Sequence, residues 1–149
     1  MKEHTRYQAA IIQNQQLLLL YVIERDPHRS YWAIPGGRRE ANESEEACVV
    51  REVFEETHLH IVVERLLFEE EGQPDLIYKR LKTYVCVPIG GTAQPGIEPE
   101  EDSVRSTISS VAWFDLHSSS TWPAEMRNDA ITFPLVQRIR AALGYGNEW

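Results

Sequence analysis

Cysteines are scarce in this sequence, and long apolar runs are absent. The 149 residues include two cysteines, Cys48 and Cys86, which are too few for a disulfide framework and suit a reducing cytoplasm. The apolar run from Leu17 to Val22 has the length of a β-strand and cannot span a membrane. The first residues, MKEHTR, do not resemble a signal peptide. We therefore expect a cytoplasmic protein that does not enter membranes.

Positive charge is also scarce relative to negative charge. The chain carries 15 Lys and Arg against 23 Asp and Glu, a formal net charge of −8 at pH 7. Because nucleic-acid binding depends on a basic surface, this balance argues against a nucleic-acid partner. Many of the acids gather in one segment, at positions 40, 43, 45, 46, 52, 55 and 56. The negative charge is therefore local and available to bind a metal ion.

The order of apolar and polar segments predicts an α/β fold. With no repeat and no linker, residues 1–149 are expected to form one domain. Strands are expected at 7–12, 17–23, 61–68, 76–89 and 111–116, the first two forming a hairpin. Loops are expected at 26–30, 71–75 and 90–102. A last helix is predicted over 131–143, ended by Gly144, with one apolar face made of Ile131, Leu135, Ile139 and Leu143.

A second helix is predicted around three carboxylates, Glu52, Glu55 and Glu56. Their spacing of i, i+3 and i+4 puts them on one side of a helix, within an arc of about 100°. Like charges so placed repel, and oxygen ligands suit a hard divalent cation such as Mg²⁺ or Mn²⁺. Either Asn42 or Ser44 is expected to cap the start of this helix. The buried side is expected opposite the acids, at Ala47, Val50, Val53 and Phe54.

The segment resembles the Nudix box, the signature of the Nudix hydrolase superfamily. From Gly37, five residues lead to Glu43, and seven more lead to Arg51-Glu52. Aliphatic Val53, the pair Glu55-Glu56 and aliphatic Leu59 complete the pattern, and the preceding WAIPGG at 32–37 resembles its usual lead-in. One position departs, because the family has Gly where His58 stands. That Gly ends the helix with a positive φ, which His adopts at moderate cost.

The resemblance implies a fold and a chemistry. The Nudix fold is an α/β fold with a mixed β-sheet sandwiched between α-helices. The expected activity is metal-dependent hydrolysis of the pyrophosphate linkage in a nucleoside diphosphate derivative, such as a nucleotide sugar, ADP-ribose or a nucleoside triphosphate. Metal ions both neutralise phosphate oxygens and activate a water. The resemblance assigns metal binding to Glu52, Glu56, Glu55 and the carbonyl of Gly37, and an orienting role to Arg51 and Glu43.

The sequence leaves several candidates for the general base and for the residues that contact the substrate. The base comes either from the helix or from a later loop, where Glu98, Glu100, Glu101 and Asp102 are candidates and Glu101 is favoured. Arg25, at the end of the second strand, matches a position where the family often has a phosphate-contacting basic residue. Arg80 and Lys82 share a face of the long strand and either grip phosphate or are simply exposed.

Several alternatives concern the substrate and the class of protein. Pro74 lies near the position where a proline marks the ADP-ribose hydrolases of the family. Asn128 either recognises the edge of a purine base or caps the last helix. Four aromatic residues either stack on a base or fill the core: Tyr31, Trp32, Trp122 and Phe133. A non-catalytic Nudix-fold nucleotide sensor is the alternative to an enzyme, but such proteins usually lose box acids that this chain keeps. The expected partner is a small-molecule nucleotide, and a homodimer is left open.

Overall fold

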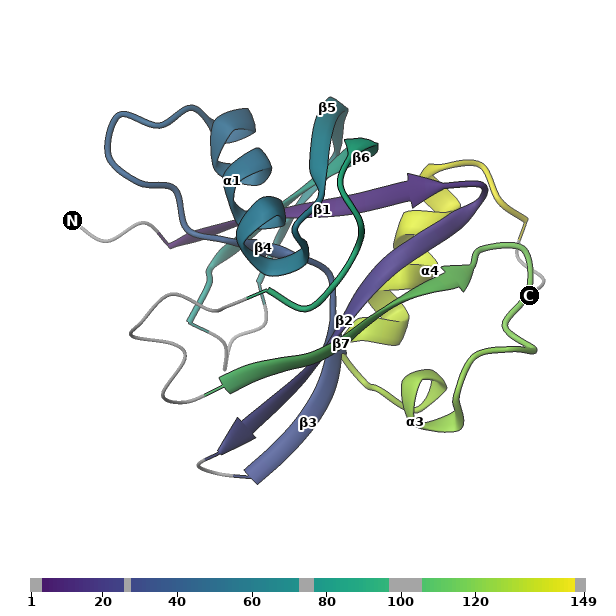
Figure 1. Cartoon of the computed structure of the whole chain (residues 1–149). Helices are drawn as coiled ribbons and strands as arrows, with labels where there is room; N and C mark the ends of the chain where they lie inside the picture. Colours follow the sequence, from purple (N-terminus) through teal and green to yellow (C-terminus); the bar gives the residue numbers. More distant parts are fainter. Residues whose placement is uncertain (1–3, 26–27, 73–76, 97–105, 147–149) are drawn as a thin grey trace.

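The computed structural model describes residues 4–25, 28–72, 77–96 and 106–146 (Figure 1). The helices and strands, in chain order, are β1 (Thr5–Gln13), β2 (Gln16–Arg25), β3 (His28–Ala33), β4 (Gly36–Gly37), α1 (Glu45–Thr57), β5 (His60–Glu71), β6 (Arg80–Gly90), β7 (Ser106–Asp115), α3 (Ala124–Arg127) and α4 (Thr132–Ala142). No helix in these ranges is both long and apolar enough to cross a membrane.

The described strands form one mixed sheet, as predicted. Its order is β3-β2-β1-β6-β5, with β4 added to β1 and β7 added to β2. β1 and β6 are parallel, and the other pairs are antiparallel. The predicted hairpin joins β1 to β2 through Asn14 and Gln15, which both have a positive φ. Such a turn matches the twist of the strands that it joins.

The two faces of β1 contact different helices, which gives the layered arrangement in Figure 1. Tyr7, Ala9 and Ile11 pack in a core cluster with Val49 and Val53 of α1. Ala10, on the opposite face, belongs to a second cluster with residues of α3 and α4, including Met126, Leu135, Val136 and Ile139. Because side chains alternate along a strand, β1 separates α1 from the C-terminal helices. The sandwich of helices around a mixed sheet is thereby confirmed.

Several predicted boundaries were wrong. Residues 28–30, expected in a loop, begin β3, because Ser30 pairs with Ile23 of β2. The long strand starts at Arg80 rather than at residue 76. β7 starts at Ser106 rather than at residue 111. Its first residues are mostly polar, but they pair with β2, and Ile108 among them is buried. The short helix α3 and the two-residue strand β4 were not predicted.

The start of the last helix also differs from its prediction. Ile131 was expected on the apolar face but is 52% exposed and precedes α4 as its N-cap residue. Asn128 does not cap this helix, since it is the C-cap residue of α3. Asp129 instead satisfies the backbone at this end, because its Oδ1 accepts hydrogen bonds from the N–H groups of Ile131 and Thr132. Gly144 follows α4 with a φ of 88°, as its predicted stop.

The orientation of α1 corrects the largest error of the sequence prediction. Val50 and Phe54, expected in the core, are 37% and 45% exposed, whereas Glu52 and Glu56 are buried. Ala47 is also exposed, and Val53 is buried as expected. The buried side of the helix therefore carries two of the three acids. The physical reason lies in the contacts of these carboxylates with the Gly36–Gly37 turn, described below.

Both ends of α1 match the predicted signals. Ser44, one of the two candidates, caps the start, because its side chain accepts a hydrogen bond from the N–H of Ala47 at 3.1 Å. His58 ends the helix in the left-handed region with a φ of 64°, where the family has Gly. Its N–H donates to the carbonyl of Phe54. A histidine thus takes a backbone conformation that glycine adopts without strain from a Cβ.

We expect His58→Gly to leave the protein equally stable or to stabilise it by roughly up to 1 kcal/mol, because Gly relieves the strain of the positive φ. The same change at exposed Ala47 inside α1 should instead destabilise by about 1 kcal/mol. Urea unfolding of the two variants measures both free energies. A clear loss of stability in His58→Gly would show that its side chain contributes more than its backbone costs.

Candidate functional site

The Gly36–Gly37 turn lies directly against the acids of α1. As β4, it pairs with Tyr7 and Gln8 of β1. The N–H of Gly36 donates a hydrogen bond of 2.8 Å to Oε1 of Glu56. A Cβ placed on Gly37 would lie 2.4–2.6 Å from the carboxylate atoms of Glu52. Any side chain at position 37 would therefore displace that carboxylate.

Arg51 connects the acids of the box to one another. Its guanidinium binds both carboxylate oxygens of Glu43, at 2.7 and 2.9 Å. The Nη1 of Arg51 also donates to Glu52 at 3.0 Å and to Glu55 at 3.3 Å. Its Nη2 reaches the backbone carbonyl of Arg38 at 3.0 Å. A charged donor with this many partners is held rigidly, and it fixes the carboxylates in turn.

These contacts and the burial of the group shift the pKa values of its members. Burial raises the pKa of Glu52 to about 7, with the charge of Arg51 opposing the shift and the charge of Glu55 adding to it. The hydrogen bond from Arg51 lowers the pKa of Glu43. The hydrogen bond to Glu43 in turn raises the pKa of Arg51. Burial thus disfavours the charged form of Glu52, although Arg51 is its hydrogen-bond partner.

The acids fit a hard metal ion by their chemistry and by their common position at the turn. Among the residues that the structure describes, no three His, Cys, Asp or Glu side chains are already gathered for metal binding. However, Glu52 and Glu56 both lie at the turn, all the donors are oxygens, and the missing side chain of Gly37 leaves room for the carboxylate of Glu52 against the turn. A cation beside Glu52 would also favour its charged form. The residues that would hold the ion are Glu52, Glu55, Glu56 and the carbonyl of Gly37.

The three cations predicted to bind substrate lie in different surroundings. Arg25 is exposed at the end of β2, in register with His28. Arg80 forms an ion pair of 2.7 Å with Glu69 on the neighbouring strand β5. Lys82 forms an ion pair of 2.9 Å with Glu45 at the start of α1, and the hydroxyl of Tyr84 donates to the same carboxylate. Arg80 and Lys82 therefore already have carboxylate partners within the chain.

Sequence reasoning missed two arginines beside the turn, Arg6 and Arg38. Their guanidinium carbons lie 5.8 and 5.5 Å from the centre of the Tyr78 ring. The charge of Arg6 acts on Glu52, and the carbonyl of Arg38 accepts from Arg51. Within the described ranges, the Nε of Arg38 is buried without a hydrogen-bond partner. No local pattern could reveal this grouping, because it depends on the pairing of β1 with β4.

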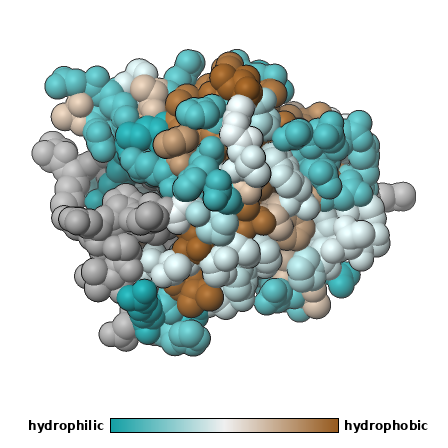
Figure 2. All heavy atoms as spheres, in the orientation of Figure 1, coloured by the Kyte–Doolittle hydropathy of each residue, from teal (hydrophilic) through white to brown (hydrophobic). Residues whose placement is uncertain are grey.

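Other candidates divide between the core and the undescribed residues. Trp32 and Trp122 are buried in one cluster, and Phe133 packs against it, while Tyr31 packs against another, so all four aromatics have core contacts. The loop acids Glu98, Glu100, Glu101 and Asp102 lie outside the described residues, as does Pro74. In Figure 2, hydrophilic residues cover the upper left of the molecule, where the segment leading into α1 lies in Figure 1.

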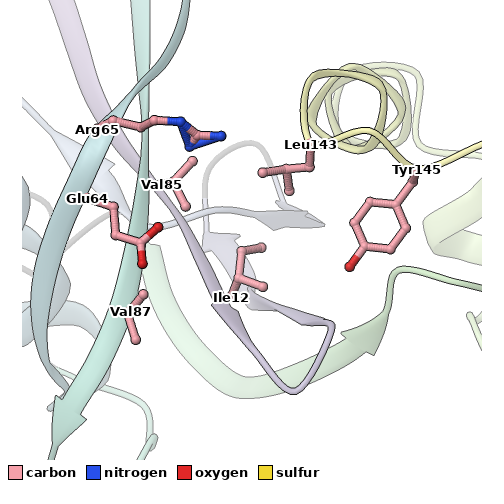
Figure 3. Close-up of a pocket in the computed structure, with 7 residues that line it drawn as sticks. All are labelled: Ile12, Glu64, Arg65, Val85, Val87, Leu143 and Tyr145. Atoms are coloured by element: carbon pink, nitrogen blue, oxygen red, sulfur yellow. The ribbon is translucent and has the colours of Figure 1, made fainter.

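A separate pocket of about 270 Å³ lies away from the box (Figure 3). It is lined by Ile12, Glu64, Arg65, Val85, Val87, Leu143 and Tyr145. Ile12 is four residues along β1 from Gln8, which pairs with the turn, and this separation corresponds to about 13 Å. Figure 3 shows the aliphatic side chains pointing into the space between the sheet and the end of α4. None of the box acids lines this pocket, so it adds nothing to their chemistry.

Comparison with known proteins identifies relatives of this arrangement. Residues 3–134 match the family model described as the NUDIX domain. The human protein named 8-oxo-dGDP phosphatase NUDT18 is 29% identical over 113 residues, which cover 76% of this chain and 32% of the relative. The chain therefore spans about a third of that relative's length.

Two solved structures share the fold. A NUDIX hydrolase from Nitrosomonas europaea aligns with a TM-score of 0.71 at 20% identity, covering 98% of this chain and 94% of its own. An ADP-ribose pyrophosphatase from Streptococcus suis aligns with a TM-score of 0.62 at 23% identity, and the alignment covers 97% of this chain and 94% of the other. At such identities the likeness extends to the fold alone.

We expect Glu45→Gln to lower the free energy of unfolding at pH 7 by roughly 0.5 to 1 kcal/mol, as for partly exposed ion pairs. Hydrogen bonds from Tyr84 and then Lys82 lower the pKa of Glu45. A lowered pKa stabilises the fold above the unfolded-state pKa, and this contribution disappears as the pH falls through the folded-state pKa. Urea unfolding at pH 7 and at about pH 3 should therefore show the difference shrinking in acid.

Glu46→Gln is the control for this prediction, because Glu46 is the exposed neighbour of Glu45 in the same helical turn. It should change stability by less than about 0.5 kcal/mol at either pH. An undiminished loss of stability for Glu45→Gln at low pH would contradict the ionic explanation.

Proposed function

This chain belongs to the NUDIX family, and from that membership we propose that it is a metal-dependent hydrolase of nucleoside diphosphate derivatives. The bond that it would cleave is the pyrophosphate linkage. The observation that carries the proposal is the convergence of Glu52 and Glu56 on the Gly36–Gly37 turn. Burying two carboxylates at one point is costly, and a bound cation would offset the part of that cost that their hydrogen bonds leave. The complete set of box acids also favours an enzyme over a non-catalytic nucleotide sensor.

Each residue of the box has a distinct role in this proposal. Glu52, Glu56, Glu55 and the carbonyl of Gly37 would hold Mg²⁺ or Mn²⁺. When bound, the ion would neutralise phosphate oxygens and lower the pKa of a water. Arg51 orients Glu52 and Glu55 through its hydrogen bonds, and Glu43 anchors Arg51 in turn. Glu101 stays our candidate for the general base, with Glu55 and Glu56 as the alternatives on the helix.

Substrate recognition would fall to cations outside the carboxylate cluster. Arg6 and Arg38 lie beside the turn, and the buried Nε of Arg38 would gain a partner from a phosphate oxygen. Arg25, Arg80 and Lys82 remain proposed contacts, although Arg80 and Lys82 would have to share their carboxylates with the substrate. The names of the similar proteins refer to an oxidised nucleoside diphosphate and to ADP-ribose, so a nucleotide with a diphosphate is the substrate class that we propose.

The two cysteines support a reducing location. Cys48 and Cys86 are both free and buried. Burial raises the pKa of each thiol to about 12, so neither is a reactive thiolate near neutral pH. They act as small core residues, and Cys48 is not expected to bind Mg²⁺ because thiolates prefer softer metals. We propose a cytoplasmic protein on this basis.

Removal of divalent metal should abolish hydrolysis, and Glu52→Gln should lower kcat by on the order of 10² or more, because the change removes a charged ligand. The assay measures the nucleoside monophosphate formed from ADP-ribose, nucleotide sugars and nucleoside di- and triphosphates by chromatography, before and after EDTA and after addition of Mg²⁺. Glu46→Gln, the same substitution at an exposed site of α1, should keep its activity. Full activity in EDTA would refute the proposed chemistry. Nucleotide binding without turnover by the unaltered protein would favour the sensor.

Arg38→Ala should raise KM by about tenfold with little change in kcat, because the residue would contact a part of the substrate that does not react. Arg127→Ala, at an exposed position of α3, serves as the control and should leave both constants unchanged. Steady-state kinetics with the best substrate of the assay above measures both constants. An unchanged KM in Arg38→Ala would remove this arginine from the substrate site, and Arg25→Ala would then be the next variant.

A further inference from the structure

The segment that follows β6, residues 91–96, lies across the C-terminal end of α1. The N–H of Gln94 donates a hydrogen bond of 3.0 Å to the carbonyl of Thr57, and the N–H of Gly96 donates one of 2.9 Å to the carbonyl of Glu56. The last carbonyls of a helix have no partner within the helix itself. Here two of them are satisfied by one crossing segment, which we call the strap.

The strap approaches the helix so closely that only glycine fits at its two contact points. A Cβ on Gly96 would lie 1.9 Å from the carbonyl oxygen of Glu55 and 2.8 Å from the carbonyl carbon of Glu56. A Cβ on Gly91 would lie 2.5 Å from the carbonyl oxygen of His58, and Gly91 has a φ of 85°. These atoms are backbone, so they cannot turn aside as the end of a flexible side chain can. The strap and the last turn of α1 therefore constrain each other.

Glu56 is held by hydrogen bonds at both its side chain and its backbone carbonyl. Its side chain accepts from the N–H of Gly36, and its carbonyl accepts from the N–H of Gly96. Glu55 precedes it, with its carbonyl pressed against Gly96. A shift of the strap would therefore move the peptide units that carry both carboxylates. A helix end capped only by His58 would lack this second restraint.

We propose that the strap, residues 91–96, positions the carboxylates of Glu55 and Glu56 by fixing the backbone of the last turn of α1. Gly96 is then a positioning residue that acts through Glu55 and Glu56 without contacting the substrate. The link to metal binding rests on the proposed function, whereas the restraint on the helix end does not.

The test compares Gly96→Ala with two other glycine variants. Gly96→Ala should weaken Mn²⁺ binding, measured by calorimetry on the full chain, by about tenfold, as expected when a support of a metal ligand is lost. Its kcat should fall by roughly 10- to 100-fold, the effect of a displacement of about 1 Å. KM for the nucleotide should change less than about threefold, because contacts to the non-reacting part are kept.

Gly144→Ala controls for a loss of stability alone. Gly144 follows α4, outside both α1 and the strap, and its φ of 88° strains any residue that has a Cβ. The substitution should lower Tm while keeping the affinity for Mn²⁺. Gly90→Ala, whose Cβ would meet only the His60 side chain at 3.9 Å, should behave as the unaltered protein. Equal losses of Mn²⁺ affinity in Gly96→Ala and Gly144→Ala would overturn the positioning role.

Amide hydrogen exchange on the unaltered protein tests the restraint without a variant. The N–H groups of Gln94 and Gly96 should exchange as slowly as those in the last turn of α1. Their hydrogen bonds to Thr57 and Glu56 should break only when that turn opens. Exchange at the rate of a free loop would refute the strap even if Gly96→Ala does not fold. If the unaltered protein binds no Mn²⁺ and cleaves no pyrophosphate, the proposed function fails, while slow exchange at Gly96 would still support the restraint.

Discussion

The structure around the box depends on the burial of Glu52 and Glu56 against the Gly36–Gly37 turn. Removing a carboxylate from water costs several kcal/mol unless other groups replace the lost hydrogen bonds. The N–H of Gly36 does this for Glu56, and the guanidinium of Arg51 does it for Glu52. Glycine at position 37 leaves the space that the carboxylate of Glu52 needs. The turn, the helix and Arg51 are thus parts of one electrostatic arrangement.

The orientation of α1 follows from this constraint and not from its apolar residues. With its acids turned toward the protein, the helix leaves Phe54 exposed, where its ring stacks on the rings of His58 and His60. Partial exposure of one aromatic side chain costs about 1 to 2 kcal/mol. Leaving two buried carboxylates without their partners would cost more. The helix therefore takes the orientation that satisfies its charges.

Charge is divided between two neighbouring groups at this end of the molecule. The acids of α1 are gathered around Arg51, whereas the guanidinium groups of Arg6 and Arg38 lie around Tyr78. A diphosphate bridged by a cation needs both kinds of charge, one to hold the cation and one to hold the remaining phosphate oxygens. The fold brings these groups together from strand β1, the turn and helix α1. Their separation in sequence is large, and their proximity is a product of strand pairing.

The sequence by itself determined the local features, because they depend on short-range geometry. The hairpin at Asn14-Gln15, a helix cap at Asn42 or Ser44 and the helix end at His58 follow from backbone conformation and nearby hydrogen bonds, and the structure selected Ser44. The spacing of the box acids predicted the family as well. Tertiary structure alone decided which side of α1 is buried, which cations are paired, and that Arg6 and Gly96 both act on the acids of the box. Periodicity describes a helix as an isolated rod, and the cost of burying a carboxylate depends on the partners that other segments supply.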